Sequence, residues 1–146
     1  DKKLISLGFS MGAFRAWQVA ALEPDVDAAV AVSWFGRWQD LIFPGSNLDK
    51  GQSSFYFLHP GLNRQLDIPD LVSLIAPRPL YLLQGGQDPL FPAASVQAAS
   101  RQLQQVWQLL GAEQALRTEL WSEGKHEFPD AQQQQVLAWL NDLTQP

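Results

Sequence analysis

The chain has 146 residues, 46% of them hydrophobic, and its 10 basic and 15 acidic residues give a net charge of −5. This composition indicates one folded domain with a hydrophobic core, and the scattered basic residues predict neither a nucleic-acid partner nor a membrane partner. No apolar run approaches the ~20 residues of a membrane helix. The absence of cysteine excludes disulfides and thiolate metal sites and leaves the compartment open.

The first predicted element is an apolar strand near Leu4–Leu7, which leads into Gly8-Phe9-Ser10-Met11-Gly12 and a helix that ends near Leu22. A Gly-x-Ser-x-Gly turn between a strand and a helix is typical of a nucleophile elbow, which exposes the serine hydroxyl. We expect Ser10 at positive φ, and we expect Gly8 and Gly12 to be glycines because a Cβ at either position would clash. The N–H of Met11 would face a developing oxyanion.

The next segment, residues 26–35, is almost continuously apolar and predicts a strand that is covered on both faces. Residues 36–66 then form a long irregular stretch, which is typical of a lid or binding loop. Its aromatic side chains either wall an acyl or sugar pocket or pin the loop to the core, and the sequence leaves both open. The candidate pocket residues are Phe9, Trp34, Phe35, Trp38 and Phe91, with Phe55, Tyr56 and Phe57 in the loop.

The remaining chain alternates predicted helices and strands. Acidic residues and a proline at 67–70 precede a short helix at 71–75, a strand spans 80–84, and a helix spans 93–110. A strand at 116–121 and a final helix from Asp130 follow. This alternation predicts a single α/β domain over residues 1–146, with a parallel sheet of about four strands and flanking helices.

Three residues with matching chemistry each follow a predicted strand: Ser10, Asp88 and His126. The carboxyl ends of parallel strands share one edge of the sheet, so the three should meet there. A serine hydroxyl needs a base to accept its proton, and the base needs an acid to orient it. The other histidine, His59, lies in the aromatic loop and is better explained as a loop-pinning residue. Two histidines and no cysteine predict no metal site and no cofactor.

Three segments together resemble the α/β-hydrolase superfamily, and most of all the bacterial dienelactone-hydrolase and acetylxylan-esterase-type proteins. They are the elbow at 8–12, the stretch 76–80 that leads to 88–92, and His126-Glu127-Phe128. The resemblance covers essentially the whole chain and aligns it with the C-terminal half of that fold. It implies Ser10 as nucleophile, Asp88 as acid, His126 as base and the Met11 N–H as one oxyanion donor. Dienelactone hydrolases proper carry a cysteine nucleophile, so a serine favours the esterase branch.

The function that these residues predict is a serine hydrolase that cleaves a small-molecule or carbohydrate ester through an acyl-enzyme. Two alternatives stay open, a prolyl-oligopeptidase-like peptidase and a non-catalytic, truncated hydrolase module. The chain begins directly on a strand, so we expect a truncated chain whose partner is the missing N-terminal half of the same fold. That half would supply the second oxyanion donor. Alone, the chain should expose Leu4, Ile5 and Leu7, associate with itself and show little activity.

Overall fold

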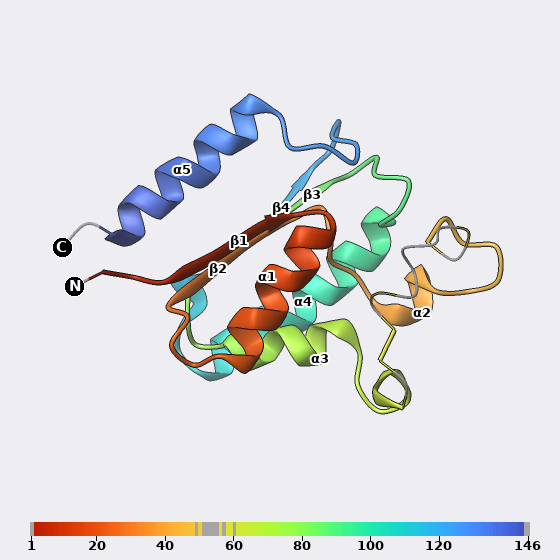
Figure 1. Cartoon of the computed structure of the whole chain (residues 1–146), viewed down its shortest axis with the longest axis horizontal. Coiled ribbons are helices and arrows are strands. Elements are labelled where there is room, and N and C mark those ends of the chain that lie inside the picture. The colour runs from red at the N-terminus through yellow and green to blue at the C-terminus, as the bar shows by residue number, and fades with distance from the viewer. Residues whose placement is uncertain (1, 49, 51–55, 57, 60, 145–146) are drawn as a thin grey trace.

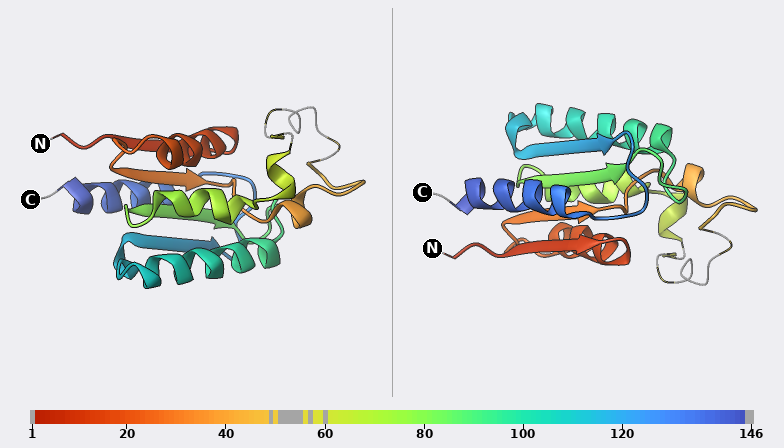
Figure 2. Two further views of the ribbon diagram at one scale, coloured as in Figure 1. Left: turned by 90° about the horizontal axis from the view of Figure 1, so that it is seen from below. Right: turned by 90° about the horizontal axis from the view of Figure 1, so that it is seen from above.

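The computed structural model describes residues 2–48, 50, 56, 58–59 and 61–144. Within them, four parallel strands form one sheet in the order β1-β2-β3-β4. The strands are β1 (Ile5–Phe9), β2 (Ala28–Val32), β3 (Leu80–Gly85) and β4 (Leu116–Trp121). Figure 2 shows β1 at one edge of the sheet and β4 at the other. The predicted α/β architecture is therefore confirmed, with the carboxyl ends of all four strands at the same side.

Helices cover both faces of this sheet (Figure 1). On one face lie α1 (Met11–Leu22), α3 (Ile68–Val72) and α4 (Ala93–Leu109), and on the other lies α5 (Asp130–Thr144). Short helical turns connect these elements: α2 (Trp38–Leu41) and the 3-10 turns η2 (Leu62–Arg64), η3 (Ser73–Ile75) and η4 (Glu113–Ala115). The strand boundaries differ from the predicted ones by a few residues, mainly because residues 26–27 and 33–35 lie outside β2.

The expected irregular stretch at 36–66 contains two elements that the sequence did not predict, α2 and η2. The carboxylate of Asp67 explains the first, since it accepts a hydrogen bond from the N–H of Trp38 at 2.7 Å, where α2 begins. The same carboxylate caps α3 through the N–H of Ile68. A residue far along the chain thus stabilises the start of α2, and local sequence patterns do not reveal such a cap.

Side chains of β2 and β3 alternate between two hydrophobic layers. Ala29, Ala31, Leu80 and Leu82 pack against the α1, α3 and α4 side, and Val30, Val32, Tyr81 and Leu83 pack against α5. Beside α5, the Tyr81 hydroxyl donates to Glu119 at 2.6 Å, and burial together with this bond raises the pKa of Tyr81. Both faces of the two central strands are therefore covered, as their continuous apolar sequences predict.

Arg78, between two prolines, ties the helical layer to the sheet. Its guanidinium donates hydrogen bonds to carbonyl oxygens at the end of α1, before β2 and at the end of η3; the acceptors are Ala20, Glu23, Val26 and Ile75. Helix ends leave carbonyls without intrahelical partners, and a cation is well suited to satisfy them. This cluster fixes where β3 starts relative to α1 and β2.

The edge strand β1 is less covered than its neighbours. Leu7 is 48% exposed and Phe9 is 38% exposed, and Leu4 just before the strand is also exposed. The prediction of exposed apolar residues near Leu4 and Leu7 is confirmed, whereas Ile5 is only partly exposed. In the described chain the outer edge of β1 has no strand beside it.

Candidate active site

The turn at Ser10 has the geometry that the elbow motif predicts. Ser10 adopts φ 55°, and its N–H donates to the carbonyl of Val32 at 2.8 Å, which holds the turn against β2. A Cβ at Gly8 would lie 2.1 Å from the carbonyl carbon of Gly12, so only glycine fits there. The same expectation for Gly12 is wrong, because a Cβ there meets no heavy atom within 4 Å. It is the backbone of Gly12 that crowds Gly8.

Ser10, His126 and Asp88 meet at the carboxyl end of the sheet. His126 Nε2 lies 2.8 Å from Ser10 Oγ, and His126 Nδ1 lies 2.7 Å from Asp88 Oδ2. With an ionised Asp88, Nδ1–H donates to the carboxylate and Nε2 accepts from the serine hydroxyl, an assignment that follows from the hydrogen-bond partners. The convergence predicted from three strand ends is thus present in the structure.

Asp88 is held in one orientation. Its side chain has no exposed surface, and Oδ1 accepts a hydrogen bond from the N–H of Leu90 at 2.9 Å. Oδ2 remains for His126. A buried carboxylate with both oxygens engaged can fix the imidazole tautomer and stabilise its protonated form.

The loop that carries His126 rests on the loop that carries Asp88. Gly86 N–H donates to the carbonyl of Trp121 at 2.6 Å, and Gln87 N–H donates to that of Gly124 at 2.7 Å. A Cβ on Gly85 would lie 2.2 Å from the Lys125 oxygen. The sequence did not predict this contact; the glycine pair Gly85-Gly86 directly after a strand is the signal that could have suggested it.

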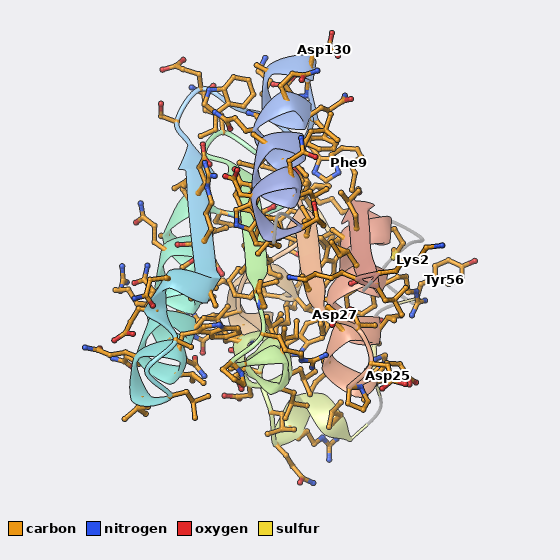
Figure 3. The ribbon with its side chains drawn as sticks, turned by 90° about the vertical axis from the view of Figure 1, so that its left-hand side faces the viewer. Lys2, Phe9, Asp25, Asp27, Tyr56 and Asp130 are labelled. Carbon is orange, nitrogen blue, oxygen red and sulfur yellow. The ribbon has the colours of Figure 1, made fainter. Side chains whose placement is uncertain are left out.

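Two aromatic rings flank the imidazole. The centroid of Phe9 lies 5.3 Å from that of His126, and Phe91 lies 6.0 Å away with an interplanar angle of 18°. Figure 3 shows Phe9 at the end of β1, on the side of the sheet where α5 lies. Trp34 packs behind Phe91 at 5.3 Å. These contacts limit the orientations that the imidazole can adopt.

The other aromatic candidates mostly belong to the core. Four of them are buried: Trp34, Phe35, Trp38 and Phe91. Their burial favours the interpretation that they pin the loop to the core and disfavours the alternative that they line an open pocket. Tyr56 is exposed. Phe55 and Phe57 lie outside the described residues. His59 lies 2.8 Å from the amide nitrogen of Gln18 on α1, as expected of a loop-pinning residue.

An ion pair supports the loop after β2. Arg37 Nε lies 2.7 Å from Asp40 Oδ2, and the N–H of Arg37 donates to Ser95 Oγ at the start of α4. Burial alone would raise the pKa of Asp40, but the hydrogen bonds from Arg37 and Ser95 outweigh it and lower that pKa. The hydrogen bond to Asp40 likewise raises the pKa of Arg37. This network joins the loop after β2 to the helix that follows Asp88.

Two further properties bear on the chemistry. The N–H of Met11 is the first of α1 and has no acceptor within the described part of the chain, so it is free to donate to an anion beside Ser10. Among the described residues there is no cluster of three or more His, Asp or Glu side chains that could hold a metal ion.

Within the part of the chain that the structure describes, no helix is long and apolar enough to span a membrane.

Comparison with known proteins then decides the family. The model of the dienelactone hydrolase family matches residues 1–138. The chain belongs to this family. It is 33% identical over 122 residues to the hydrolase YtaP of Bacillus subtilis (strain 168), a match that covers 84% of this chain and 40% of YtaP.

Several solved structures share the fold, and two glucuronoyl esterases are among them. A glucuronoyl esterase from Solibacter usitatus superposes with a TM-score of 0.72 at 15% identity, over 92% of this chain and 41% of that one. The catalytic domain of a glucuronoyl esterase from Hypocrea jecorina has a TM-score of 0.71 at 21% identity, over 95% and 44% of the two chains. The chain therefore spans about two fifths of the length of these relatives.

The two glycines of the elbow give a matched test of its packing. We expect Gly8→Ala to destabilise the full-length gene product by about 3 kcal/mol, because the added Cβ meets backbone atoms that cannot rotate away. Gly12→Ala should change the free energy of unfolding by less than about 1 kcal/mol. Urea unfolding measures both, and equal stabilities for the two variants would contradict the close approach at Gly8.

Proposed function

We propose that the protein is a serine hydrolase that cleaves a carboxylic ester through an acyl-enzyme. The observation that carries this proposal is the pair of short contacts that His126 makes, 2.8 Å to Ser10 and 2.7 Å to Asp88. Nucleophile, base and acid in this connected arrangement are what acyl transfer to a serine requires. The family supports hydrolysis as the reaction class.

The proposed reaction has two halves. Ser10 Oγ attacks the ester carbonyl carbon while His126 Nε2 takes the hydroxyl proton, and the tetrahedral oxyanion turns toward the Met11 N–H. The imidazolium returns its proton to the leaving alcohol as the C–O bond breaks, which leaves an acyl-serine. His126 then takes a proton from water, the resulting hydroxide attacks the acyl carbon, and the carboxylic acid leaves as Ser10 recovers its proton. Asp88 stabilises the imidazolium in both halves.

The proposed substrate is a small-molecule or carbohydrate ester. Glucuronoyl esterases stand among the solved structures that share the fold, and a further one is named a methylesterase. Their names concern esters of carbohydrates or simple alcohols, which is why we propose an ester bond over the peptide bond of a prolyl-oligopeptidase-like enzyme. The three connected side chains support an enzyme over a non-catalytic module.

We also propose that further strands of the same fold pack against β1. The outer edge of β1 has no strand beside it in the described chain, the apolar side chains of Leu7 and Phe9 are partly exposed, and the relatives are more than twice as long. An unpaired apolar edge strand is a template for another strand. The same added segment would supply the second oxyanion donor, and losing one such donor typically lowers turnover by about 10² to 10³.

The test of the reaction is Ser10→Ala in the full-length gene product. We expect kcat/KM for p-nitrophenyl acetate to fall by at least about 10³, because the nucleophile is lost while the packing is unchanged. Ser122→Ala, an exposed serine in the loop before His126, is the control and should retain wild-type turnover. Wild-type turnover in Ser10→Ala would show that another residue is the nucleophile.

The test of the uncovered edge uses residues 1–146 alone. We expect this polypeptide to sediment as dimers or larger species with little esterase activity, and Leu7→Lys to shift it toward monomer, because a lysine on an edge strand opposes pairing. Leu109→Lys changes an exposed leucine on α4, at the other edge of the sheet, and should leave the association unchanged. A monomer with the turnover of the full-length protein would contradict the proposal.

A further inference from the structure

The loop that carries His126 has to reach from one edge of the sheet toward the other. It leaves β4 at one edge, whereas Ser10 follows β1 at the opposite edge, and three strand spacings of ~4.8 Å, about 14 Å in all, separate these strands. Figure 2 shows this loop crossing the carboxyl ends of the strands before it enters α5. Its first part, up to Lys125, is held against the loop after β3 by backbone contacts. The part that reaches Ser10 lies beyond those contacts.

Within the described residues, no backbone hydrogen bond ties the part of the loop around His126 to a strand. The bonds that its backbone does make are local or lead to α5. The N–H of Glu127 donates to the carbonyl of Lys125 at 3.0 Å, and the carbonyl of Phe128 accepts from the Gln133 side chain at 2.8 Å. Contacts of side chains must therefore fix where His126 lies along the strand ends.

The ring of Phe9 makes two such contacts. Its centroid lies 5.3 Å from that of His126 and 6.3 Å from that of Phe128, and its plane is stacked on Phe128 at an interplanar angle of 18°. Phe9 lies on the side of the sheet where α5 packs (Figure 3), and Phe128 packs against the hydrophobic layer on that same side. A side chain of β1 thus contacts two residues of a loop that starts at the opposite edge.

The imidazole is contacted by rings from both hydrophobic layers. Phe91, 6.0 Å away, belongs to the layer on the opposite side of the sheet and is fully buried, whereas Phe9 is 38% exposed. We propose that Phe9 is a positioning residue, which keeps the loop in place with His126 over Ser10. This inference rests on the proposed function, in which His126 is the base. Without the ring the loop samples more positions, and only the fraction with Nε2 in reach of Ser10 can react.

Steady-state kinetics of the full-length gene product test this role. In Phe9→Ala we expect kcat for p-nitrophenyl acetate to fall about tenfold with KM unchanged within about twofold, since His126 acts in both halves of the reaction. Phe9→Tyr keeps the ring and should retain wild-type kcat. Leu7→Ala, two residues earlier on the same face of β1, removes apolar packing away from the loop and should lower stability without lowering kcat. All variants are compared at a temperature where circular dichroism shows them folded. Wild-type kcat in Phe9→Ala, or an equal loss in Leu7→Ala, overturns the proposal.

Proton NMR without substrate gives a second, independent test. The Nδ1–H of His126 is protected from exchange with water as long as it donates to Asp88. We expect this proton to exchange at least about tenfold faster in Phe9→Ala than in the wild type, and at the wild-type rate in Phe9→Tyr and Leu7→Ala. The measurement involves no turnover, so its outcome does not depend on whether Ser10 is the nucleophile. An unchanged exchange rate in Phe9→Ala would show that the imidazole is held without Phe9 and would overturn the proposal.

Discussion

The candidate active site depends on the close approach of two backbone segments, Gly8 in β1 and Gly12 in α1. A Cβ at Gly8 would lie 2.1 Å from the carbonyl carbon of Gly12. The short turn between β1 and α1 therefore requires a glycine at position 8. The short turn forces Ser10 to φ 55°, a conformation that non-glycine residues rarely adopt. It also directs the hydroxyl out of the sheet, toward His126, and starts α1 with the free N–H of Met11 beside it.

Parallel topology supplies the other two residues. Asp88 follows β3 and His126 follows β4, so residues 38 positions apart in sequence lie at adjacent strand ends. The two loops then hold each other through Gly86 and Gln87, and the narrow contact at Gly85 sets their separation. Phe9 and Phe91 complete the support by packing beside the imidazole. The geometry thus follows from strand order together with these contacts between the loops and the aromatic rings.

The sequence predicted what repeats along the chain or occupies a recognisable turn. The apolar runs predicted the strands. The elbow motif, together with an acid and a histidine that each follow a strand, predicted Ser10, Asp88 and His126 as the site residues. Contacts between distant segments were not predictable in this way. Asp67 caps α2 from 29 residues away, the amide of Gln84 is oriented by Phe35, and the aromatic rings near the loop are mostly core. Gly12 was misjudged because the motif does not say which of two touching residues lacks room for a side chain.

The central claim is that His126 and Asp88 activate Ser10 as a nucleophile, and covalent labelling tests it most directly. The full-length gene product is treated with a fluorophosphonate, digested, and mapped by mass spectrometry. The account predicts one modified residue, Ser10, labelled at a rate that falls at least about 10²-fold in His126→Ala, because general-base assistance is lost. Modification of a different serine, or rapid labelling of Ser10 that does not depend on His126, would contradict it.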